Sequence, residues 1–93
     1  MNADGRNALK ELYYKIDEHR DLLEQIQSEI AGMMCDEEAK LDNLPDALRE
    51  SETGERIQEC VDTLEASISD LEEVNTCIYN CLEHLEEILG SVF

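Results

Sequence analysis

The sequence has no Trp, one Pro and four Gly among its 93 residues, and its aromatic residues are three Tyr and one Phe. With so few aromatic side chains, a core has to be built mainly from Leu and Ile. With so little Pro and Gly, few positions interrupt a helix. The single proline, Pro45, stands near the middle of the chain. The composition therefore predicts an almost wholly helical protein with one break at its centre.

Long apolar runs and a basic surface are also lacking. No stretch approaches the ~20 apolar residues that a membrane-spanning helix needs, and the first residues have no apolar signal-peptide core. The net charge is −17, from 24 acidic and 7 basic residues, which disfavours binding to nucleic acid or membranes and favours a basic protein partner. We expect a cytoplasmic protein whose four Cys are reduced thiols.

Apolar residues recur at alternating steps of four and three in the second half of the chain, the pattern of a helix that packs along another helix. We call this row the seam of the second helix, and Asn75 is its one polar member: Ile57, Val61, Leu64, Ile68, Leu71, Asn75, Ile78, Leu82, Leu85 and Leu89. The first half repeats the pattern, with His19 as its polar member: Leu9, Leu12, Ile16, His19, Leu23, Ile26, Ile30 and Met33.

The two seams predict an all-α fold, an antiparallel helical hairpin of the coiled-coil type. We expect a single domain over 1–93, with a helix over 4–41, a turn or short helix over 42–50 and a helix over 51–89. Asp4 and Ser51 are the expected N-caps. Facing residues of such a hairpin have a constant sum of residue numbers, so Leu9 pairs with Leu85 and the remaining seam positions pair in turn. His19 then meets Asn75 in one hydrogen-bonded polar layer that fixes the register.

One edge of the second helix widens its apolar stripe beyond the seam. It holds the residues that precede every second seam position: Cys60, Ser67, Val74, Cys81 and Ile88. A stripe of this width is typical of bundle helices, and a chain of this size builds a marginal core on its own. We therefore expect two hairpins to pair as a homodimeric four-helix bundle.

Few residues have spacing that suggests chemistry. Cys77, Cys81 and His84 share one side of a helix, where they could hold zinc, but three ligands without a supporting loop lack the usual geometry of a structural zinc site. Small thiols beside a polar His are the interpretation that we favour, and we predict no metal or cofactor. No pattern provides a nucleophile with its base or a phosphate-binding Gly loop, so we predict no enzyme activity.

Acidic residues dominate the second helix. No Lys or Arg follows Arg56, whereas nine acidic residues do. A helix of ~36 residues is ~54 Å long, so 17 net charges fall at about one per 3 Å, between the one per ~1.7 Å of duplex DNA and the one per ~3.4 Å of a single strand. Two interpretations remain open. The acidic surface binds a basic partner, including by mimicry of nucleic acid, or it only keeps a structural or adaptor bundle in solution.

Inside this acidic helix, residues 74–82 carry no charge. Tyr79 and Asn80 lie there outside the seam, with acidic residues on both sides, which is the anatomy of a contact patch with an anionic rim. Such a patch suits self-association as well as it suits a foreign partner. The predicted protein-binding residues are Glu65, Asp70, Glu72, Glu73, Tyr79, Asn80, Glu83, Glu86 and Glu87.

A spaced motif spans the central break: Asn43-Leu44-Pro45-x-x-Leu48-x-x-Ser51-x-x-Gly54. With the Leu- and Glu-rich helix that follows, it resembles small helical proteins encoded by phages and mobile elements of Gram-positive bacteria. Such short acidic proteins include inhibitors of bacterial defence systems, among them anti-CRISPR proteins that occupy nucleic-acid sites. The resemblance implies an inhibitor in the host bacterial cytoplasm, with a nucleic-acid-binding nuclease as its partner.

Overall fold

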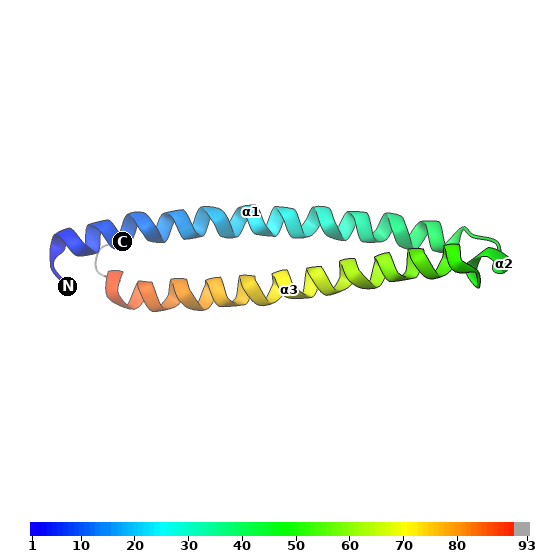
Figure 1. Cartoon of the computed structure of the whole chain (residues 1–93). Coiled ribbons are helices and arrows are strands. Elements are labelled where there is room, and N and C mark those ends of the chain that lie inside the picture. The colour runs from blue at the N-terminus through cyan, green and yellow to red at the C-terminus, as the bar shows by residue number, and fades with distance from the viewer. Residues whose placement is uncertain (91–93) are drawn as a thin grey trace. The chain divides into compact units, whose positions relative to one another are not determined.

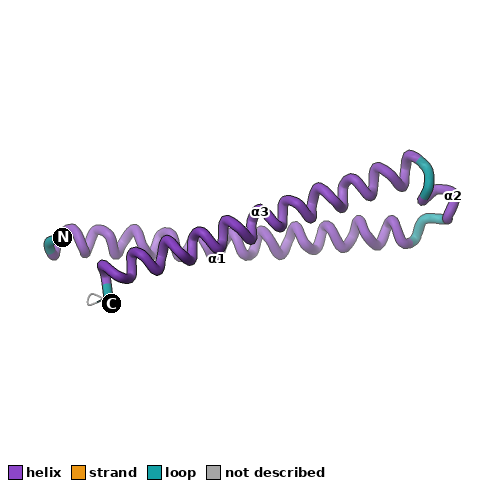
Figure 2. The backbone as a smooth tube through the Cα atoms, turned by 90° about the horizontal axis from the view of Figure 1, so that it is seen from below, coloured by secondary structure: helices purple, strands orange, loops and turns teal. Residues whose placement is uncertain are grey.

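The computed structural model describes residues 1–90, and the last residues, 91–93, lie outside the described part. Within 1–90 the chain forms helices α1 (Ala3–Asp42), α2 (Asp46–Arg49) and α3 (Glu52–Leu89), and no strand (Figure 2). The bounds of α1 and α3 lie within one residue of those predicted. The central break contains the separate short helix that was one of its two predicted forms.

The caps differ from the prediction in chemistry. Asn2, rather than Asp4, caps α1, because its Oδ1 accepts a hydrogen bond of 2.8 Å from the Gly5 N–H. Asp4 lies inside the first turn, where its charge favours the helix dipole. Ser51 does precede α3, but its hydroxyl donates to the Leu48 carbonyl oxygen at 2.5 Å and so closes the connection from α2.

The chain divides into two compact units, which we describe separately. Unit 1 combines residues 1–25 with the chain from residue 72 onward, the blue and the orange-to-red segments that lie side by side in Figure 1. Tyr13 contacts Glu86 and Arg20 contacts Tyr79, so the two segments of unit 1 run antiparallel. Unit 2, residues 26–71, is a helical hairpin made by the rest of α1, α2 and the first part of α3.

The seam of α3 is confirmed throughout. Each of its predicted residues is buried or half-buried, and apart from Gly54 and Ser67 the other residues of α3 are exposed. Val61, Leu82 and Leu89 are the most deeply buried, at 6%, 3% and 0% exposure. Strict spacing by three and four thus selected the correct face of α3 from end to end.

The seam of α1 is confirmed only in part. The half-buried residues that the prediction named are Leu9, Ile16, Leu23, Ile26 and Ile30. Leu12, His19 and Met33 were also placed in the seam, and that prediction is wrong because all three are exposed. The next residue along the helix takes the inward place in each case: Tyr13, Arg20 and Met34.

The turn of unit 2 is closed by Arg49 and Gly54. The Arg49 Nη2 group donates to the Asp42 carbonyl oxygen at 2.9 Å, which satisfies one of the free carbonyls at the end of α1. Gly54 is buried, and a Cβ atom there would overlap the Arg49 carbonyl oxygen and its neighbouring backbone atoms. The absence of a side chain at residue 54 therefore allows α3 to start against α2.

We expect Gly54→Ala to destabilise the protein by about 1–3 kcal/mol, the usual cost of forcing extra atoms into a packed site. The added methyl group meets backbone, which cannot move aside as a flexible side chain can. Urea unfolding followed by circular dichroism measures the loss.

Gly32→Ala is the matched control. Gly32 lies inside α1, and a Cβ there meets no atom within 4 Å. This substitution should raise stability by up to about 1 kcal/mol, because Ala has the higher helix propensity. Equal midpoints for the two variants would contradict the close contact between Gly54 and Arg49.

Candidate protein-binding site

The seam of α3 has a row of residues along each side, spaced by seven and therefore aligned along the helix. We call one row the acidic edge: Gln58, Glu65, Glu72, Tyr79 and Glu86. We call the other row the uncharged edge: Cys60, Ser67, Val74, Cys81 and Ile88. One helix thus presents two surfaces of different chemistry on either side of a shared buried row.

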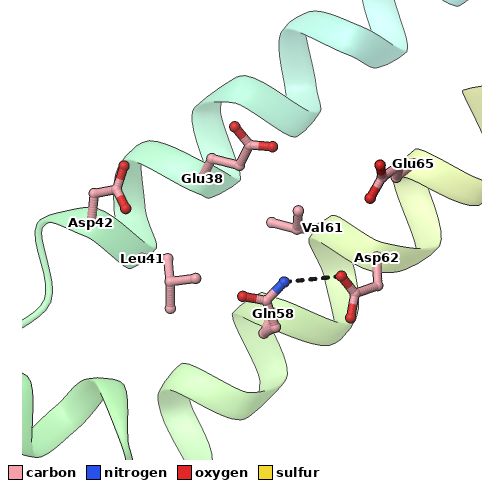
Figure 3. Close-up of a pocket in the computed structure, with 7 residues that line it drawn as sticks. All are labelled: Glu38, Leu41, Asp42, Gln58, Val61, Asp62 and Glu65. Carbon is pink, nitrogen blue, oxygen red and sulfur yellow. Dashed lines mark hydrogen bonds between the residues drawn. The ribbon is translucent and has the colours of Figure 1, made fainter.

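In unit 2, the acidic edge borders a surface hollow of about 320 Å³, shown in Figure 3. Both helices of the hairpin line it: Glu38, Leu41 and Asp42 from α1, and Gln58, Val61, Asp62 and Glu65 from α3. The side chains of Leu41 and Val61 point into the space between the helices, and Gln58 donates to the Asp62 carboxylate at 2.9 Å. The hollow therefore has an apolar floor and a rim of four carboxylates.

This combination suits one kind of side chain. Lys and Arg place their carbon stems against apolar surface and keep the charged end among polar groups. In this hollow, a stem would lie on Leu41 and Val61 while the cation reaches the carboxylates. An Arg would also match the carboxylates with its planar set of donors. The hollow has the chemistry of a receptor for a basic side chain of another protein.

Sequence reasoning identified only one of the four carboxylates, Glu65. Glu38 and Asp42 were missed because the predicted seam of α1 stopped at Met33. Met34 and Leu41 are both half-buried and lie seven residues apart, so the inward-facing row of α1 continues from Met34 to the hollow. Following that row would have placed Glu38 and Asp42 beside the first turns of α3.

In unit 1, the acidic edge is tied to α1 through Tyr13. The Tyr13 hydroxyl donates to the Glu86 carboxylate at 2.5 Å, and its ring meets Tyr14 edge to face with the centroids 5.6 Å apart. The hydrogen bond to Glu86, then the loss of water and the negative charge of Glu86, raise the pKa of Tyr13 to about 12. Glu86, a predicted binding residue, thus also has a structural role.

Arg20 makes the second link to the acidic edge. Its guanidinium carbon lies 4.7 Å from the centroid of the Tyr79 ring, a cation–π contact, and its Nη2 atom pairs with Asp17 at 2.7 Å. Tyr79, the predicted centre of the uncharged patch, is therefore engaged within the chain and is 49% exposed. Asn80 beside it is exposed.

Of the other predicted acidic residues, Glu72 lies on the acidic edge and the rest lie on the outer side of α3. They are all exposed: Asp70, Glu72, Glu73, Glu83 and Glu87. These residues lie at several positions around the axis of α3, so they form a broad acidic surface and not one compact site. The hollow of unit 2, by contrast, is lined by carboxylates from both helices.

The polar layer differs from the prediction. His19 is exposed, and its Nδ1–H donates to the Lys15 carbonyl oxygen of the same helix at 2.7 Å. Asn75 is buried, at 9% exposure. The predicted burial of His19 is wrong, because Arg20 takes the inward position and leaves the imidazole in water. A register-setting role for Asn75 stays a prediction.

The candidate zinc ligands Cys77, Cys81 and His84 are all exposed along α3. Over the described residues, no group of three or more His, Cys, Asp or Glu side chains is placed to hold a metal ion. All four Cys are exposed free thiols. These cysteines are therefore available to reagents in solution.

Comparison of the chain with protein-family models, with curated protein sequences and with solved structures finds no match. Of the helices in residues 1–90, none has both the length and the apolar character of a membrane span. The function therefore has to be inferred from the surfaces of the two units.

We expect the Tyr13 phenol to titrate near pH 12. The folded-state pKa is above the ordinary Tyr pKa of 10.0, so its contribution to stability is present below pH 10 and is lost as the pH rises through about 12. The absorbance change at 295 nm, measured for the wild type minus Tyr13→Phe, isolates this one phenol.

Glu86→Gln tests the cause of that shift. Because the Glu86 charge and its hydrogen bond raise the pKa, the difference titration in this background should move toward lower pH. A midpoint that does not move would show that Glu86 is not the partner of Tyr13 in solution.

Proposed function

We propose that the protein is a non-enzymatic binding module that places its acidic surface on a basic partner protein. The hollow of unit 2 is the observation that carries the proposal, because it offers four carboxylates above an apolar floor. The acidic edge and the outer side of α3 surround it with further negative charge and with no Lys or Arg after Arg56. Such a surface speeds the encounter with a cationic partner and selects against anionic ones.

The partner that we propose is a nucleic-acid-binding protein, such as a nuclease of a bacterial defence system. Two observations support this choice: a charge density of nucleic-acid order and the resemblance of residues 43–54 to phage and mobile-element proteins. The module would then act in the host cytoplasm as an inhibitor, by occupying the site that nucleic acid needs. No residue of this chain has to perform chemistry in such a mechanism.

The module acts as a homodimer in this proposal, with two chains paired into a four-helix bundle. The uncharged edge of α3 supports the pairing, since it places apolar and thiol side chains in water in a single chain. The same edge favours the second candidate function, a structural or adaptor bundle in which acidity serves only solubility. The two functions differ in whether the carboxylates contact a partner.

The test is capture from nuclease-treated bacterial lysate on the immobilised protein, with elution in steps of rising salt. We expect basic proteins to be retained by the wild type and released at moderate salt, because salt screens charge pairs at a surface. The variant Glu38→Gln/Asp62→Asn/Glu65→Gln removes three carboxylates of the hollow and should retain at least tenfold less. Duplex DNA added to the wild-type resin should displace a partner that is bound at its nucleic-acid site.

The matched control is Glu11→Gln/Glu18→Gln/Asp36→Asn, which changes the net charge equally at exposed positions of α1. It should retain the partner as the wild type does. Equal losses in the two variants would show that overall charge, and not the hollow, holds the partner. A wild type that retains no basic protein would favour the adaptor function.

A further inference from the structure

Unit 1 has an apolar face on the side of the uncharged edge. An open groove of about 540 Å³ lies there, lined by Leu12, Lys15, Ile16, His19 and Ile78. Leu12 of this lining is 53% exposed, and on the uncharged edge of the same unit Val74 and Ile88 are 44% and 47% exposed. Exposed apolar side chains that gather on one face mark a binding surface more often than single ones do.

The exposed area of the chain is large for its mass. The protein exposes 6617 Å², whereas a monomeric globular protein of 10.6 kDa exposes about 5500 Å². The excess is of the order of the ~800 Å² per partner that a stable interface buries. The core is correspondingly thin, since the buried apolar side chains of the described residues are Val61, Leu82 and Leu89.

The arrangement of the apolar side chains indicates what covers the face. On the uncharged edge, Val74 and Ile88 lie seven residues on either side of Cys81. A two-fold axis across the helices brings residue i of one copy onto residue j of the other and j onto i. Two side chains at equal distances from one point on a helix can exchange in this way when the axis passes through that point.

We propose that the occupant of this face is a second copy of the chain, packed with its α3 antiparallel to the first α3. Cys81 of each copy lies at the two-fold axis, and Val74 of each faces Ile88 of the other. This inference rests on the pairing in the proposed function and deepens it by naming the face and the orientation. The acidic edge, on the opposite side of the seam, stays open to a partner.

The charge of the chain gives this interface a distinctive response to salt. Two chains of charge −17 repel each other, and the face between them carries no acidic residue along the uncharged edge. Salt screens the repulsion without weakening apolar contact. Self-association should therefore tighten as salt rises, whereas binding of a basic partner by the acidic edge weakens.

Sedimentation equilibrium of the full chain at about 20 mM and about 300 mM salt tests the pairing. We expect a dimer whose dissociation constant falls at least threefold at the higher salt. Val74→Glu/Ile88→Glu should give a monomer with unchanged helicity by circular dichroism. Thr76→Glu/Asn80→Glu adds the same charge at exposed positions off this edge, and should remain dimeric.

Variants that keep one Cys test the orientation by mild oxidation with diamide. The variant with Cys81 alone should form a covalent dimer, and the variant with Cys60 alone should not, because antiparallel α3 helices centred on residue 81 place the two Cys60 thiols far apart.

Cross-linking through Cys60 and not through Cys81 would overturn the orientation. A dimer that survives Val74→Glu/Ile88→Glu would overturn this face but not the pairing. A wild-type monomer would overturn the pairing as well. None of these three outcomes affects the separate experiment in which the hollow captures basic proteins.

Discussion

The apolar seam of α3 is the constraint on which the rest of the structure depends. Few side chains are buried in the described chain, and Val61, Leu82 and Leu89 on this helix are the apolar ones. A domain of this size folds with little free energy to spare. It cannot bury a charge without a partner, so the acidic residues of α3 are confined to its acidic edge and its outer side. The surface that we propose as functional is thus a direct consequence of the thin core.

The seam of α1 is adapted to the acidic edge of α3. At two of its inward positions α1 has Tyr13 and Arg20, which carry an apolar body and a polar end. The bodies cover the seam while the ends reach Glu86 and the ring of Tyr79. Leu at these two positions would fill the same space without making either contact. The polar ends therefore order part of the acidic edge, and they leave the uncharged edge to apolar contacts alone.

The sequence was sufficient for α3 and insufficient for half of α1, for a physical reason. On α3 the residues on either side of each seam position are mostly polar, so only one apolar row fits the spacing. On α1 two rows fit it, because Leu12 stands beside Tyr13 and Met33 beside Met34. Periodicity cannot choose between adjacent candidates. The choice depends on which side chains find partners across the helix pair, and that information lies in the opposite helix.

The motif behind the resemblance consists of the residues that close the turn of unit 2. Pro45 precedes α2, the Leu48 carbonyl accepts a hydrogen bond from the Ser51 hydroxyl, and Gly54 leaves room for the Arg49 backbone. These residues fix the register of α3 along α1 within unit 2, and they bring Glu38 and Asp42 opposite Asp62 and Glu65. The motif therefore specifies the turn, and through the turn the register of unit 2. The carboxylates around the hollow can vary without disturbing that turn. In the function that we propose, the rim and not the motif therefore determines which partner is bound.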